Sequence, residues 1–121
     1  MDADLHLLFA AGQVRYAVPS NVAAEVVKNP PLQTVPGSPA HVLGVFAHRG
    51  EVVPLIDLAQ LFEGTPESGP RAVLARSGGN VVAFTARVVL GVRVRVTGRV
   101  AVLQAFARLF ALTEPRPVAR S

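Results

Sequence analysis

The sequence predicts a small all-β domain with short helices, in which one structural unit is used twice. Three observations carry this prediction. At 121 residues, half of them hydrophobic, the chain is long enough for one domain with its own core. Short runs rich in Val, Leu and Phe alternate with clusters of Gly, Pro and Asn, which is typical of strands joined by turns. Residues 42–62 also match residues 89–110 in register when one extra residue is allowed in the later turn.

The first forty residues predict a hairpin, a short helix and a loop. Residues 5–18 read as two strands around Gly12 and Gln13, a turn signal. The stretch that begins at Ser20 predicts a short helix, because Ser20 can accept from first-turn N–H groups and Ala, Glu and Val follow it. Four prolines between residues 29 and 39 remove ladder donors, so we expect an ordered, extended crossing loop there.

The middle of the chain predicts strands at residues 41–47 and 51–57, joined by His48, Arg49 and Gly50. Pro54 should restrict the second strand to a sheet edge or a bulge. A helical turn follows at residues 58–62, and Asp57 is placed to cap its N-terminus.

Residues 63–70 read as a surface loop and are the expected boundary between subdomains 1–70 and 71–121. Beyond it, residues 71–77 and 80–86 predict a second hairpin around Gly78 and Gly79.

The internal repeat predicts two related halves. Val42 to Val45 match Val89 to Val92, and further apolar matches continue into the helical segments. A unit of strand, turn, strand and helix has one apolar face that it cannot bury alone, so the copies should pack together. The residues expected in the core are Val45, Val53, Leu55, Leu61, Phe62, Val92, Leu103, Leu109 and Phe110. The second copy lacks a counterpart of residues 19–41, which predicts a shortened second half.

Charge and composition narrow the function classes. Residues 1–70 carry three cations against seven acids, whereas residues 71–121 carry nine arginines against Glu114 alone, which suggests an acidic partner for the second half. Nucleic acid is an unlikely partner because the arginines alternate with valines, as on a solvated strand face, and stacking aromatics are missing nearby. The chain has no cysteine, no signal-peptide pattern and no apolar stretch near the ~20 residues of a membrane span, so we expect a soluble, cytoplasmic protein without membrane insertion.

Catalysis and metal binding are not expected. The chain has no Cys nucleophile, no Gly-rich phosphate loop and no serine in a nucleophile-elbow pattern. His6 and His41 have no acid at ligand spacing, and Asp57 fits a helix cap better than a general acid. We therefore expect neither a catalytic site, a metal site nor a cofactor.

Residues 36–62 resemble the central signature of CheW-like domains, in which a Pro-containing loop, a "GV" strand, an "NLRG" turn and a "PVVDL" strand follow in order; here they read "PGSPAHVLGVFAHRGEVVPLIDLAQLF". The resemblance extends over nearly the whole chain and is weaker after residue 71. It implies two intertwined SH3-like β-barrels, the second one shortened. It also implies a cytoplasmic, non-catalytic adaptor that couples the cytoplasmic tips of chemoreceptors to a CheA-type histidine kinase. Short, degenerate members occur in systems such as the Frz pathway, which this chain resembles.

The resemblance assigns protein-binding roles by position. Arg49 corresponds to the turn arginine of the family, Gly44 to its strand glycine and Glu25 to the acid before the crossing loop, with Ala23 beside it and His48 adjacent in the turn. Arg49 would present a planar, always-charged fork to a carboxylate or carbonyl of a partner; the alternative is a solvated turn residue. For the whole chain the alternatives are a modulator that binds receptors but not the kinase, and a basic SH3-like barrel that binds nucleic acid. An incomplete second barrel would also leave a strand edge open to self-association.

Overall fold

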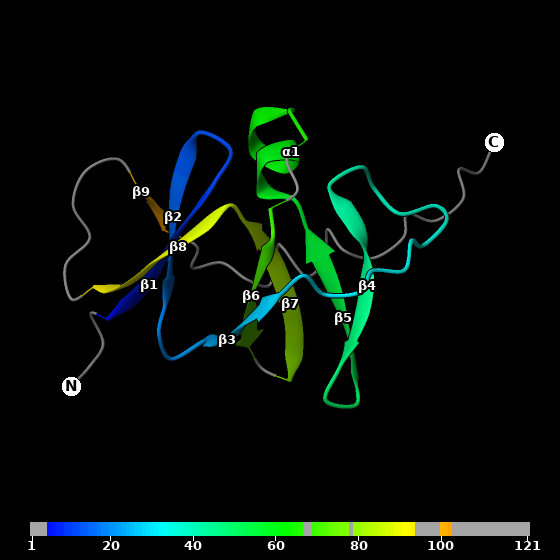
Figure 1. The fold of residues 1–121 in the computed structure, drawn as a ribbon, viewed down its shortest axis with the longest axis horizontal. Coiled ribbons are helices and arrows are strands. Elements are labelled where there is room, and N and C mark those ends of the chain that lie inside the picture. The colour runs from blue at the N-terminus through cyan, green and yellow to red at the C-terminus, as the bar shows by residue number, and fades with distance from the viewer. Residues whose placement is uncertain (1–4, 67–68, 78, 94–99, 103–121) are drawn as a thin grey trace.

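The computed structural model describes residues 5–66, 69–77, 79–93 and 100–102. Within these ranges the chain forms two β-sheets and one short helix (Figure 1). One sheet has the strand order β8-β1-β2-β9 and the other the order β3-β6-β7-β5-β4. The elements are β1 (His6–Ala11), β2 (Val14–Pro19), β3 (Ala23–Lys28), β4 (Val42–His48), β5 (Glu51–Ile56), α1 (Leu58–Glu63), β6 (Arg71–Ser77), β7 (Asn80–Ala86), β8 (Val88–Arg93) and β9 (Val100–Val102).

Each sheet is built on a hairpin from one half of the sequence and completed by strands from the other half. The β1–β2 hairpin pairs with β8 in antiparallel and β9 in parallel orientation, and the β6–β7 hairpin pairs in the same way with β3 and β5. This exchange of strands confirms the predicted all-β, intertwined architecture. The hairpins expected around Gly12 and at residues 48–50 and 78–79 are confirmed as well.

Strand β8 resembles β4 in sequence but occupies the position in its sheet that β3 occupies in the other sheet. Its residues 89–92 match residues 42–45 of β4, yet β8 lies on the first strand of its hairpin as β3 does in the other sheet. The reason is the connection, because β8 follows β7 after Arg87 alone, whereas residues 29–41 separate β3 from β4. A strand that follows the preceding strand without a crossing loop can reach only a pairing position close to the end of that strand.

The β6–β7 hairpin lies between two hydrophobic clusters. One cluster joins the two sheets and contains Phe9, Ala11, Tyr16, Val18, Ile56, Leu58, Val73, Ala75, Val82, Phe84 and Ala86. The second, which we call the inner cluster, contains Phe46, Val53, Leu55, Ala72, Leu74 and Ala83. Alternate residues of β6 and β7 therefore enter opposite clusters, which explains why both strands are nearly continuous apolar runs in the sequence.

The helix predicted from Ser20 is wrong, because this segment is strand β3. Ala23 to Lys28 pair in antiparallel register with Ala75 to Arg71, with an irregularity between Ala23 and Glu25. Helix propensity is a weak preference that tertiary contacts override, and the ladder to β6 satisfies the backbone of this segment as a strand.

The expectation for Pro54 is also wrong, since β5 lies between β7 and β4 rather than at an edge. The physical reason is that β7 pairs only with Leu55 and Ile56. Pro54 faces Val45 of β4 and lies before the paired part of the β5–β7 ladder, so its missing N–H removes no bond to β7.

The core prediction is confirmed in part. Val53 and Leu55 are buried, whereas Val45 and Leu61 are half-buried. The predicted burial of Phe62 and Val92 is wrong, because their exposed fractions are 57% and 52%. Phe62 follows the last residue of α1 that packs on the core, and Val92 lies on β8 at the end of the sheet as described. The other expected core residues, Leu103, Leu109 and Phe110, lie outside the described ranges.

Helix α1 begins at the predicted residue and ends one residue later than predicted, at Glu63. The buried Asp57 side chain accepts a hydrogen bond from the Gln60 N–H at 3.2 Å, which confirms the N-cap. Gly64 ends the helix in the left-handed conformation. Within the described residues, no helix has the length and apolar character needed to cross a membrane.

Candidate functional site

The β4–β5 hairpin ends in a tight two-residue turn. Arg49 and Gly50 both have positive φ, 51° and 79°, and the flanking residues His48 and Glu51 pair across the strands. Two left-handed residues in a two-residue loop match the twist of the flanking strands. The turn places Arg49 at the tip of the hairpin. This tip is at the lower end of Figure 1.

Four strands place an ionisable side chain at the same end of the five-stranded sheet. Phe46, Val53 and Leu74 belong to the inner cluster and Val27 packs against it. Because every second residue of a strand points to the same face, the inward positions beyond them follow by register. These positions are Glu25 on β3, His48 on β4, Glu51 on β5 and Arg76 on β6. We call these four residues, together with Arg49, the end cluster.

Glu25 joins the two outermost strands of the sheet. Its Oε2 lies 3.1 Å from His48 Nε2, and its Oε1 lies 3.4 Å from Arg49 Nε. Arg49 Nη2 also donates to Glu25 Oε2 at 3.5 Å. Strands β3 and β4 are at opposite ends of the strand order, so these contacts connect the two edge strands at one end through side chains rather than through a ladder.

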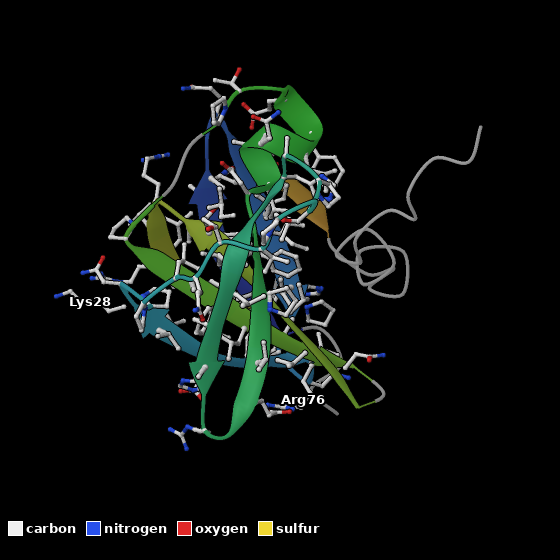
Figure 2. All side chains as sticks on the ribbon, turned by 90° about the vertical axis from the view of Figure 1, so that its right-hand side faces the viewer. Lys28 and Arg76 are labelled. Carbon is white, nitrogen blue, oxygen red and sulfur yellow. The ribbon has the colours of Figure 1, made fainter. Side chains whose placement is uncertain are left out.

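A second ion pair lies beside the first. Arg76 donates from Nη1 and Nη2 to the two carboxylate oxygens of Glu51, at 2.8 and 2.6 Å. This two-point geometry is the strong form of the arginine–carboxylate contact. Figure 2 shows Arg76 near the free end of the β4–β5 hairpin, far from Lys28.

The contacts shift the acidity of both carboxyl groups. The hydrogen-bonding contact with His48 and, next among the stabilising causes, the charge of Arg49 hold the pKa of Glu25 below its ordinary value. Hydrogen bonding from Arg76 lowers the pKa of Glu51 and raises that of Arg76. Both glutamates are therefore held in their charged form.

The structure brings together three of the five residues expected to bind a partner. Glu25, His48 and Arg49, which come from two regions of the sequence, are in direct contact. His48, expected beside Arg49 in the turn, is the last residue of β4 and has a side chain only 19% exposed. Ala23 lies on β3 opposite Ala75, on the far side of the strand irregularity from Glu25.

Gly44 is buried in β4 and has a packing reason to be glycine. A Cβ at this position would lie 2.5 Å from the carbonyl oxygen of Gln33 in the crossing loop. Gln33 and Val45 exchange backbone hydrogen bonds of 2.8 and 2.9 Å, which bind the loop to β4. Gly44 thus allows the loop to approach the hairpin that carries Arg49.

Sequence reasoning missed Glu51 and Arg76. Each lies at one end of a period-two pattern of inward-facing apolar residues, because Glu51 comes two residues before Val53 and Arg76 comes two residues after Leu74. That signal was present in the sequence. The pairing of Glu51 with Arg76 could not be predicted from the sequence, because it depends on the order of the strands in the sheet.

Arg49 is the most exposed member of the end cluster. Its side chain is 76% exposed and stands on the two-residue turn. Its contacts with Glu25 are 3.4 and 3.5 Å, longer than those of Arg76 with Glu51. Across the described part of the chain, no group of three His, Asp or Glu residues could hold a metal ion.

Comparison with protein families and curated sequences gives one consistent result. The family model for the CheW-like domain matches residues 5–112. Protein FrzA of Myxococcus xanthus is 39% identical over 88 residues, covering 70% of this chain and 55% of FrzA. Chemotaxis protein CheW of Treponema pallidum (strain Nichols) is 36% identical over 64 residues, covering 50% of this chain and 38% of that protein. The match therefore spans about half, or less, of the length of these relatives.

Comparison with solved structures agrees. The scaffolding protein TtCheW from Thermoanaerobacter tengcongensis superposes with a TM-score of 0.68 at 21% identity. The superposition covers 75% of this chain and 64% of TtCheW. The two proteins share a fold.

Proposed function

Because the chain belongs to the CheW-like domain family, we propose that it is a non-catalytic adaptor in a bacterial chemosensory pathway. Its partners in this proposal are the cytoplasmic tips of chemoreceptors and, through a second contact, a CheA-type histidine kinase. The similarity to FrzA favours a Frz-type system. The adaptor would act at the cytoplasmic side of the receptors.

The observation that carries the proposal is the position of Arg49. This guanidinium is the most exposed member of the two ion pairs at the hairpin tip. A guanidinium offers several donors in a fixed plane, so it can contact Glu25 and still present donors to a partner carboxylate or carbonyl. An exposed charge on a stiff turn favours selective contact with a polar partner surface.

Glu25 and His48 have a supporting role in this proposal. Glu25 directs Arg49 from β3, and the half-buried His48 contacts the same carboxylate. Loss of Glu25 would leave Arg49 in place but free to adopt more rotamers. Binding through Arg49 would then cost more conformational entropy. In the proposal, therefore, Glu25 is a positioning residue and Arg49 contacts the partner.

The test is direct binding of the purified chain to a chemoreceptor cytoplasmic domain from the same genome. The variants are Arg49→Glu and the matched control Arg15→Glu, which makes the same charge change at an exposed residue of β2. We expect Arg49→Glu to weaken binding about tenfold or more, a typical cost for reversing an interface charge. The control should bind like wild type. Arg49→Glu should lower the melting temperature only slightly, because it replaces an exposed ion pair with Glu25 by two like charges, and a cooperative melt of each variant checks that it is folded.

The kinase arm of the same experiment separates the alternatives. Binding to both the receptor domain and the regulatory domain of the kinase would support coupling. Binding to the receptor alone would indicate a modulator. Salt-sensitive retention on DNA without binding to either protein would contradict the adaptor function. Equal receptor affinity of wild type and Arg49→Glu would contradict the role of Arg49.

A further inference from the structure

Two cations face each other at the end of the five-stranded sheet opposite the end cluster. Lys28, the last residue of β3, pairs directly with Arg71, the first residue of β6. Residues in direct register across an antiparallel pair have Cβ atoms roughly 5 Å apart. Arg87 lies immediately after Ala86, the residue of β7 that pairs with Arg71. Lys28 and Arg71 therefore form a like-charged pair at the end of the β3–β6 ladder, and Arg87 is a third cation near the end of β7.

No acidic partner accompanies these cations in the part of the chain that the structure describes. The ion pairs found there join His48 and Arg49 to Glu25, and Arg76 to Glu51, all at the opposite end of the sheet. Like charges in direct register destabilise a sheet. The Lys28–Arg71 pair thus carries a repulsion that an external anion would relieve. Lys28 and Arg87 are exposed and Arg71 is half-buried.

The same place has an open strand edge. β3 is at the end of its sheet, and β6 is its ladder partner among the described residues. On the face that carries Lys28, the next residue is Val26, whose exposed fraction is 40%. An edge strand offers main-chain donors and acceptors that an added strand can pair with. Figure 2 shows Lys28 projecting from the side of the molecule, away from Arg76.

We propose that the edge of β3, together with Lys28 and Arg71, binds an extended acidic segment of a partner protein, which adds to the sheet as a strand. Charge complementarity selects the occupant. Main-chain bonds to β3 supply affinity, carboxylates of the segment meet the two cations, and an apolar residue covers Val26. A nucleic acid fits less well because the chain has no Trp and its one Tyr, Tyr16, is buried, so no described aromatic ring is available for base stacking at this edge. This surface is separate from Arg49 and does not depend on the adaptor role.

The test uses a fluorescein-labelled synthetic peptide that alternates Glu and Val, with binding measured by fluorescence anisotropy. A matched peptide carries Pro in place of each Val, keeping the charge but losing the ladder donors. We expect the Val peptide to bind about tenfold or more tightly than the Pro peptide. Its affinity should fall as salt rises from about 0.05 to 0.5 M.

The variant Lys28→Glu separates binding from folding. It replaces two like charges in register with an ion pair, so the melting temperature should stay the same or rise. Affinity for the Val peptide should fall about tenfold or more, because one cation is lost and an anion is placed at the site. Arg15→Glu, which makes the same charge change on β2 of the other sheet, is the matched control and should bind the Val peptide like wild type. Lys28→Met, which removes the charge without adding an ion pair, should weaken binding by a smaller factor.

Three results would overturn the proposal. They are equal binding of the Val and Pro peptides, unchanged affinity of Lys28→Glu, and tighter binding of a single-stranded oligonucleotide of equal charge. The first result would contradict strand addition, and the second would contradict the role of Lys28 in binding. The third would indicate that the partner is a nucleic acid rather than an acidic segment. Failure of receptor binding by the wild-type chain would bear on the adaptor function alone.

Discussion

Substitution of two phenylalanines by alanine tests how the sheets pack. Phe84 of β7 is fully buried, with its ring stacked 6.3 Å from that of Phe9 across the two sheets. Phe62 at the end of α1 is 57% exposed and contacts the ring of Tyr16 at 6.2 Å. The two changes delete the same atoms, so a difference in stability reports burial alone.

The expected magnitudes follow from these environments. Phe84→Ala should cost about 3–5 kcal/mol of unfolding free energy, because transfer energy is lost and a cavity is left. Complete burial of a Phe side chain contributes roughly 1.5–3 kcal/mol. Phe62 buries a little under half of its surface, so Phe62→Ala should cost about 1 kcal/mol. Water fills the space at Phe62, and no cavity term is added.

Urea unfolding followed by circular dichroism measures both variants against wild type. With a slope of roughly 2 kcal/mol per molar urea, Phe84→Ala should lower the midpoint by about 2 M and Phe62→Ala by about 0.5 M. If Phe84→Ala does not fold, Phe84→Leu keeps most of the volume and should fall between the two. Equal losses at the two positions, or a larger loss at Phe62, would refute the assignment of Phe84 to the core that joins the sheets.

The remaining predictions concern the helix cap and the end cluster. Asp57→Ala should lower the unfolding free energy by about 0.5–2 kcal/mol in the same urea assay, with Asp57→Asn retaining most of the stability; identical losses for the two would contradict the cap. Glu25 has a lowered pKa in the folded chain, so its charged form contributes stability that is complete above its ordinary pKa of about 4.3 and is lost as pH falls through the lowered value. Thermal melts from pH 6 to 3 should therefore show a smaller acid-induced drop for Glu25→Gln than for wild type, and parallel curves would exclude this linkage.

Much of the architecture could be predicted from local signals. Gly12 marks the first hairpin because a tight turn needs positive φ, and it has a φ of 61°. Asp57 before a short apolar run predicts a cap, and the structure has one. Each of these signals acts over a few residues, so it is readable without knowledge of the fold.

Other features depended on neighbours that are distant in sequence. The segment from Ser20 read as a helix, but its pairing with β6 made it a strand. Phe62 matched a residue of the repeat, yet its burial depended on which face of α1 met the core. Periodicity describes one element at a time, whereas burial is a property of the contact between elements.

The sequence by itself determined the strand-forming runs, their turns, the capped helix and the candidate residues Glu25, His48 and Arg49. Only the tertiary structure decided that these three residues meet, and that Glu51 and Arg76 lie beside them. The physical reason is that turns and caps are local hydrogen-bonding choices, whereas ion pairs between strands require strand order, register and inward direction together. The same strand order places Lys28 opposite Arg71, a like-charge pair that no local pattern predicts.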